Sequence, residues 1–114
     1  MELIIEVYRC TSGFPGHETY GLSGQMRRAA VSIPSNIAEG KGRYSQKELM
    51  HFLFRARGSL LELQTQTTIA QRLGYLDKAR VQKVENYSDE VGRLLNGMIS
   101  RFTEMQAGEI QRVR

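Results

Sequence analysis

Cysteine and proline are scarce in this sequence, with one cysteine and two prolines among 114 residues. The single cysteine, Cys10, excludes an internal disulfide and a metal cage built of thiolates. No apolar run is long enough to cross a bilayer or to resemble a secretory signal. No linker rich in Pro, Gly and Ser divides the chain. These absences favour one cytoplasmic domain over residues 1–114, with no membrane partner.

The composition is that of an ordinary globular protein, with 40% hydrophobic and 25% charged residues. A domain of this length buries roughly two-thirds of the surface of its unfolded chain, which allows a core without disulfides. The net charge is +4 and the sequence pI is about 9.5. This charge allows an anionic partner but does not require one.

The second half of the chain has the spacing of two long helices, predicted over about 45–73 and 77–106. Ser45 and Glu48 form a capping box at the first helix start. Gly74 suits the end of that helix, and Asp77 suits the start of the next. Apolar or small residues recur in steps of three and four, as in a helix bundle. They are Leu49, Leu53, Ala56, Leu60, Leu63, Thr67 and Ala70, then Val81, Val84, Ser88, Val91, Leu95, Met98, Phe102 and Met105.

The first half predicts two further helices, over about 2–12 and 22–39. Met26, Ala29, Ile33 and Ile37 share one face of the longer helix. The first helix begins at Met1 without a capping residue and is short or truncated. No segment alternates apolar and polar residues as a strand does. We therefore predict an all-α fold, an antiparallel up-down four-helix bundle.

Basic residues are concentrated around the end of the second predicted helix and the start of the third. Cations there would neutralise phosphates, and Tyr44 among them could stack on an exposed base. The alternative is a solvated helix face that keeps the protein soluble. The candidate nucleic-acid-binding residues are Arg27, Arg28, Lys41, Arg43, Tyr44, Lys47, Arg55 and Arg57.

A polar strip lies beside the apolar face of the second helix. It contains Gln25, Arg28, Ser32, Ser35, Asn36 and Glu39. One interpretation is a contact surface for a partner or a phosphate backbone. The other is a set of groups that pair with adjacent helices or another subunit and fix their register.

No motif predicts catalysis, a cofactor or a small-molecule substrate. The glycines around Lys41 join helix to helix and lack the spacing of a phosphate-binding loop. His17 and His51 are not spaced as metal ligands, and no Glu-x-x-His pair supports a di-iron site at Glu39 and Glu62. We attribute Gly58 with Ser59 to close helix approach, since a mid-helix glycine otherwise costs about 1 kcal/mol.

A set of motifs covering roughly residues 1–102 resembles a known family. The residues are Phe14-Pro15, Glu18, Tyr20-Gly21-Leu22, Gln25, Arg27-Arg28-Ala29-Ala30, Ser32-Ile33-Pro34, Asn36-Ile37-Ala38-Glu39-Gly40, Arg43, Gly58-Ser59, Glu62 and Gly74-Tyr75-Leu76. They resemble the signature of the four-helix bundle proteins encoded in intervening sequences of 23S ribosomal RNA, also called S23 ribosomal proteins. In that family a longer first helix is usual.

The resemblance implies an up-down bundle that assembles into a homopentameric ring. It also implies a fold related to the accessory variability protein of diversity-generating retroelements, which is thought to engage nucleic acid. For most members no activity is established. The resemblance marks a strip of Arg27, Arg28, Ser32, Asn36, Glu39 and Arg43, and signature or assembly positions at Gly40, Gly58, Ser59 and Glu62.

Two hypotheses about function follow. In the first, a non-catalytic homo-oligomeric bundle binds structured RNA or a nucleoprotein through its basic surface. In the second, a structural adaptor binds proteins and its positive charge has no nucleic-acid role. Salt separates them, because phosphate binding weakens steeply with ionic strength and an apolar interface does not.

Overall fold

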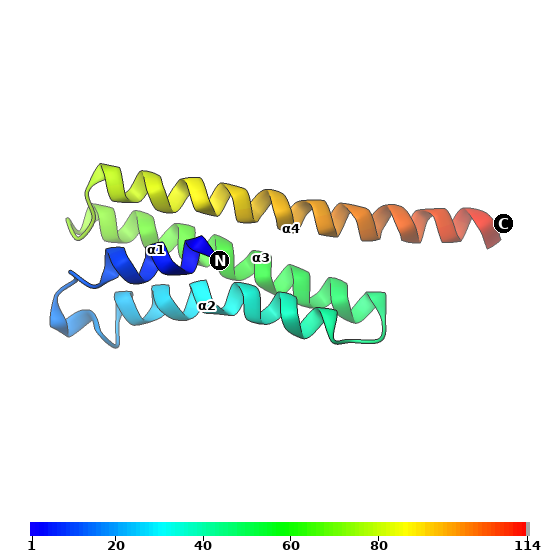
Figure 1. Ribbon diagram of the computed structural model, residues 1–114, viewed down its shortest axis with the longest axis horizontal. Coiled ribbons are helices and arrows are strands. Elements are labelled where there is room, and N and C mark those ends of the chain that lie inside the picture. The colour runs from blue at the N-terminus through cyan, green and yellow to red at the C-terminus, as the bar shows by residue number, and fades with distance from the viewer. Residues whose placement is uncertain (114) are drawn as a thin grey trace.

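The computed structural model describes residues 1–113, and within them the fold is all-helical with no strand. The elements are α1 (Glu2–Thr11), a 3₁₀ turn η1 (Gly16–Glu18), α2 (Leu22–Lys41), α3 (Gln46–Arg72) and α4 (Lys78–Val113). Successive helices run in opposite directions along an elongated bundle of 59 × 23 × 19 Å (Figure 1). The predicted four-helix bundle fold is confirmed.

The helix ends follow the local signals in the sequence. The Ser45 hydroxyl accepts a hydrogen bond from the Glu48 N–H at 3.0 Å, and Asp77 accepts one from the Arg80 N–H at 2.8 Å. Gly74 has a φ of +82°, the left-handed conformation that lets α3 end and the chain reverse. The observed α2 and α3 differ from the predicted ranges by at most two residues at each end, whereas α4 continues to Val113.

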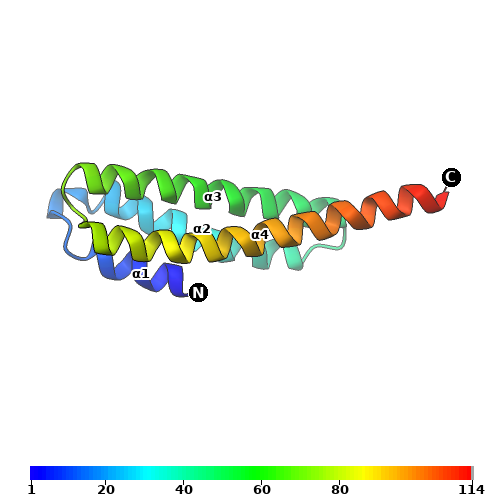
Figure 2. The same ribbon diagram turned by 90° about the horizontal axis from the view of Figure 1, so that it is seen from above.

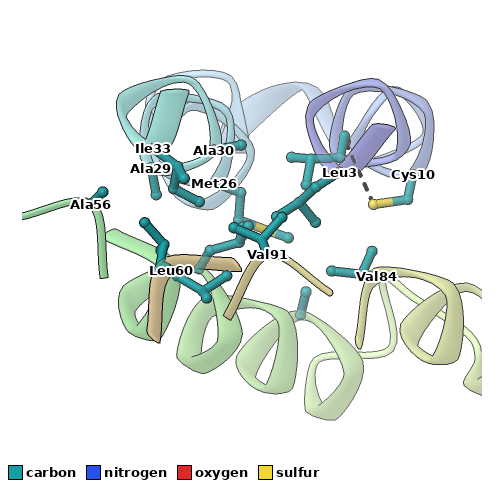
Figure 3. Close-up of a cluster of buried hydrophobic side chains, with 14 of the residues drawn as sticks. Leu3, Cys10, Met26, Ala29, Ala30, Ile33, Ala56, Leu60, Val84 and Val91 are labelled. Carbon is teal, nitrogen blue, oxygen red and sulfur yellow. Dashed lines mark hydrogen bonds between the residues drawn. The ribbon is translucent and has the colours of Figure 1, made fainter. Parts of the chain in front are cut away.

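All four helices contribute to one hydrophobic core (Figure 3). Each helix turns its apolar positions inward, so the spacing of three and four seen in the sequence becomes a continuous interior. The largest fully buried apolar side chains come from α1, α2, α3 and α4 in turn, as Leu3, Val7, Met26, Ile33, Leu53, Leu63, Val84 and Leu95.

The first helix is short, as predicted, and it covers only part of the bundle. Figures 1 and 2 show α1 beside the half that lies near the α3–α4 turn. Toward the α2–α3 turn the bundle has only α2, α3 and α4. Phe14 holds the segment after α1 against the bundle. Its ring centroid lies 5.1 Å from that of Tyr75.

None of the described helices combines the length and the apolar composition that a bilayer-crossing helix requires.

Candidate nucleic-acid interface

The α2–α3 turn is a short connection held at both ends. Gly42 caps α2 with its N–H directed at the last carbonyls of the helix, and the Arg43 N–H donates to Gly40 O at 3.1 Å. Ser45 then caps α3 through its side chain. Arg43 and Tyr44 therefore protrude from a constrained backbone, which lowers the entropy that a ligand would have to remove.

The Tyr44 ring is fully exposed, with a relative accessibility of 107%. A second aromatic ring, Phe52 on the first part of α3, is partly buried nearby. The guanidinium carbons of Arg43 and Arg55 lie 5.1 and 5.6 Å from its centroid. The His51 and Phe52 rings pack edge to face, with their centroids 5.6 Å apart. The turn thus presents one free aromatic face and one ring covered by cations.

Two open hollows flank the turn and share Arg43 and Glu48. One, of about 600 Å³, is lined by Arg43, Ser45, Lys47, Glu48, His51 and Phe52. The other, of about 450 Å³, is lined by Ala38, Glu39, Gly42, Arg43, Tyr44 and Glu48. The region contains four cations and two carboxylates, so it keeps an excess of two positive charges. The cations are Lys41, Arg43, Lys47 and Arg55, and the carboxylates are Glu39 and Glu48.

Arg43 is the one cation of this region that forms a salt bridge in the described residues. Its Nη2 lies 2.5 Å from Glu39 Oε1, and both side chains are about half exposed. An exposed pair of this kind contributes little to stability, so a phosphate could compete with the carboxylate. We expected Glu39 to pair with another helix or subunit. Within the chain its partner is Arg43, four residues later.

Three of the predicted binding residues lie outside the turn region. Arg27 donates from Nε to Thr11 Oγ1 at 2.9 Å, and its guanidinium lies 4.7 Å from the Tyr8 ring centroid. Arg28 is seven residues into α2, and thirteen residues at about 1.5 Å each separate it from Lys41 by about 20 Å. The prediction that these arginines crowd the end of α2 is therefore wrong, because the helix is long enough to separate them.

Arg57 also has a partner within the chain. Its guanidinium lies 4.9 Å from the Phe54 ring centroid, and its Nη1 donates to Asn96 Oδ1 of α4 at 3.3 Å. It therefore points toward α4, whereas Arg55 lies against Phe52. The structure brings together Lys41, Arg43, Tyr44, Lys47 and Arg55, and it separates Arg27, Arg28 and Arg57 from them.

One residue of the polar strip of α2 contacts another helix through a side-chain hydrogen bond. Ser32 Oγ and Ser59 Oγ form a hydrogen bond of 2.5 Å that joins α2 to α3. Asn36 donates to Ser32 O of its own helix at 2.8 Å. The Ser32–Ser59 bond supports the interpretation in which the strip fixes helix register at that position, whereas the Asn36 bond stays within α2.

The signature glycines differ in what surrounds them. A Cβ on Gly40 would lie 2.9 Å from both Leu49 Cδ1 and Phe52 Cβ, so α2 and α3 approach closely there. A Cβ on Gly58 would have no atom within 4 Å. The predicted close helix approach is therefore absent at Gly58 within this chain, whereas Ser59 beside it bonds to Ser32 of α2. Glu62 is exposed and accepts a hydrogen bond from Gln66 Nε2 at 3.2 Å.

The described residues contain no group of three or more His, Cys, Asp or Glu side chains that could hold a metal ion. Burial raises the pKa of the Cys10 thiol to about 11, helped by the negative charge of Glu6. A thiol of that pKa is a poor nucleophile near neutral pH.

Phe52 was not among the residues predicted for this region. The available signal was its position three residues before Arg55 on the predicted helix, because residues i and i+3 are neighbours on a helix surface. Its proximity to Arg43 depends on the tight turn and the close approach at Gly40, which spacing alone does not show.

Comparison with known proteins supports the resemblance seen in the motifs. The sequence profile described as "23S rRNA-intervening sequence protein" matches residues 1–97. The crystal structure of a protein of unknown function from the S23 ribosomal protein family of Bacteroides thetaiotaomicron superposes with a TM-score of 0.78. The two sequences are 21% identical, and the alignment covers 86% of this chain and 92% of that one. No curated protein matches the chain.

Proposed function

Because the chain belongs to the 23S rRNA-intervening sequence protein family, we propose that it is a non-catalytic bundle that self-assembles and binds RNA through the α2–α3 turn. The observation that carries this proposal is the fully exposed ring of Tyr44 in a turn with four cations and two carboxylates. We place this activity in the cytoplasm. The proposed ligand is RNA with unpaired bases.

The two kinds of side chain in the turn suit the two parts of such a ligand. Lys41, Arg43 and Lys47 offer charges to phosphates and release counterions on binding. Tyr44 offers a ring face to an unstacked base, a contact worth about 1–3 kcal/mol per base. Unpaired loops expose bases in this way, whereas an RNA duplex hides them. We therefore expect a preference for loops and bulges in structured RNA.

Self-assembly is the second part of the proposal. The family resemblance implies a ring of five chains. With a chain mass of 13.0 kDa, five copies have a mass of about 65 kDa, from 5 × 13.0. Light scattering in solution measures this mass directly. A monomeric protein at micromolar concentration would contradict this part and leave RNA binding to be judged by its own test.

A protein-binding adaptor is the second candidate, because apolar side chains are exposed on the outer side of α3, among them Phe54 and Leu61. Ionic strength distinguishes the candidates. Neutralising up to four phosphates of single-stranded RNA predicts a slope of up to about −3 for log affinity against log salt. An adaptor interface of apolar character would show a slope near zero.

The decisive variant reverses three charges of the turn, Lys41→Glu, Arg43→Glu and Lys47→Glu. We expect filter retention of a hairpin RNA with an unpaired loop to be lost while the helical circular dichroism remains. The matched control makes the same charge change toward the other end of the bundle, at Arg72, Lys78 and Lys83, and retains the RNA. Unchanged RNA affinity in the folded turn variant would refute binding at this site.

A further inference from the structure

The hollow of about 450 Å³ beside the α2–α3 turn holds an acid, a base and an aromatic ring together. Glu39, Arg43 and Tyr44 all line it, and the turn lies at the end of the bundle away from the α3–α4 turn (Figure 1). Its volume falls in the range of sites for small molecules. A nucleotide presents three matching groups, which are the face of its base, the edge of its base and a phosphate.

Glu39 is the unexpected member of this set. It lies in the last turn of α2, where the helix dipole disfavours a negative charge. A carboxylate also repels the phosphates that the neighbouring cations attract. The other carboxylate of the hollow, Glu48, has an ordinary place in the first turn of α3, where the dipole favours it. Glu39 therefore has a cost for both helix stability and phosphate binding, which a contact with a base would offset.

The edge of guanine suits a carboxylate better than the edge of any other RNA base. An ionised carboxylate only accepts hydrogen bonds, through two oxygens side by side. Guanine has two adjacent donors on its Watson–Crick edge, N1–H and the N2 amino group. Adenine and cytosine present one amino donor beside an acceptor, and uracil presents one N–H between two carbonyls. Proteins read unpaired bases along these edges.

The pair of Glu39 with Arg43 links the edge of the base to the phosphate. Arg43 donates to Oε1 of Glu39, whose side chain is 55% exposed. A phosphate that replaces the carboxylate at Arg43 leaves both oxygens of Glu39 free to accept from a base. The Arg43 guanidinium lies 5.1 Å from the Phe52 ring centroid, so the ring holds it near the turn during this exchange.

We propose that Glu39, Arg43 and Tyr44 bind one unpaired guanine nucleotide of the RNA. The base stacks on Tyr44 and donates N1–H and N2–H to Glu39, and a phosphate binds Arg43. The inference rests on the RNA binding proposed above and names the base that this site selects. A base without two adjacent donors places an acceptor against the carboxylate. We expect the preference for guanine to be about tenfold, the lower part of the range for a bidentate contact with a base.

Four hairpin RNAs test the preference of the wild-type chain. They share a stem and a loop of uridines and differ at one loop position, which is guanine, inosine, adenine or cytosine. Fluorescence anisotropy should show binding of the guanine hairpin about tenfold tighter than that of the other three. Inosine is the most informative of them, because it differs from guanine only in lacking the N2 amino group.

Glu39→Gln separates base recognition from simple repulsion of phosphates. The amide has one donor and one acceptor, which match the amino group and N1 of adenine. We expect every hairpin to bind more tightly because a negative charge is removed, and the guanine-to-adenine ratio to fall about tenfold or more. If Glu39 only holds Arg43, all affinities rise together and the ratio stays constant. That result would overturn the inference.

Glu85→Gln is the matched control, since it makes the same change at an exposed residue near the start of α4. It should leave both affinity and preference unchanged, and circular dichroism should show the same helicity in both variants. Equal binding of the four hairpins by the wild-type chain, or a preference for another base, would overturn guanine selection and still support RNA binding. Failure to bind any hairpin would overturn the proposed function itself.

Discussion

Among the arginines that lie against aromatic rings, Arg27 and Arg43 make different use of the contact. At the contact of α1 with α2, Arg27 covers the Tyr8 ring and donates to Thr11. At the α2–α3 turn, Arg43 covers Phe52 and forms only an exposed pair with Glu39. The first guanidinium is engaged by its own chain, whereas the second has a partner that phosphate can replace. Residue type alone does not distinguish a structural arginine from a binding one.

The largest expected effect is a loss of stability when a core residue of α1 is truncated. Leu3→Ala removes a side chain that is 1% exposed and leaves a cavity between α1 and the core. We expect a loss of about 3 kcal/mol in the free energy of unfolding, measured by urea denaturation. RNA affinity of the remaining folded protein should be unchanged, because α1 does not reach the α2–α3 turn. A matching loss of affinity would show that the two regions are coupled.

Tyr44→Ala and Tyr8→Ala form the next contrast. Removing the exposed Tyr44 ring should lower RNA affinity by about 1–3 kcal/mol, or roughly 5- to 150-fold, and leave the melting temperature unchanged. Tyr8→Ala should lower stability and leave the affinity unchanged, since the ring packs on Arg27. Fluorescence anisotropy with a labelled hairpin RNA measures the first effect. The comparison fails if both tyrosines affect the same property.

Arg27→Gln should be a smaller change of stability. The variant loses the contact with Tyr8 and weakens the bond to Thr11, which together predict a loss of about 1 kcal/mol in the free energy of unfolding. Arg43→Gln is the matched substitution in the turn and should leave that free energy within about 0.5 kcal/mol. Only Arg43→Gln should weaken RNA binding.

The smallest effect is the pH dependence that Cys10 contributes. The folded pKa of this thiol is about 11 against an ordinary value of 9.0, so above pH 9 the unfolded chain loses a proton that the folded chain keeps. Stability from this group is therefore complete below pH 9 and is lost as the pH rises toward 11. Near pH 9.5 the loss is under about 1 kcal/mol. It should vanish in Cys10→Ala, measured as the difference between the two pH profiles of unfolding.

Much of the fold could be predicted because the local spacing of apolar residues determines which side chains form the interior of a helical bundle. The core positions of α2, α3 and α4 followed steps of three and four, and Ser45, Gly74 and Asp77 marked helix ends. The extension of α4 to Val113 was missed because the apolar pattern fades after Met105. The confirmed family resemblance added specificity that spacing could not supply.

The candidate site was harder to predict, because a sequence does not reveal which donors the folded chain already uses. Arg27 and Arg57 belonged to the predicted basic patch, yet each has partners on another helix. Phe52 lies beside Arg43 only because the turn is tight and α2 and α3 approach closely at Gly40. Gly58 was attributed to close helix approach, but no atom of this chain lies within 4 Å of a Cβ placed there.

The short α1 has a mechanical consequence. The bundle is four helices thick at the α3–α4 end and three helices thick toward the α2–α3 turn, so fewer apolar contacts brace the thinner end. Amide hydrogens should accordingly exchange faster in the last turns of α2 and the first turns of α3 than in the half beneath α1. A protein built in this way is rigid at one end and compliant at the other. Tyr44 projects from the capped turn at the compliant end, so the turn keeps its own shape while the helix ends that carry it can shift against an irregular surface.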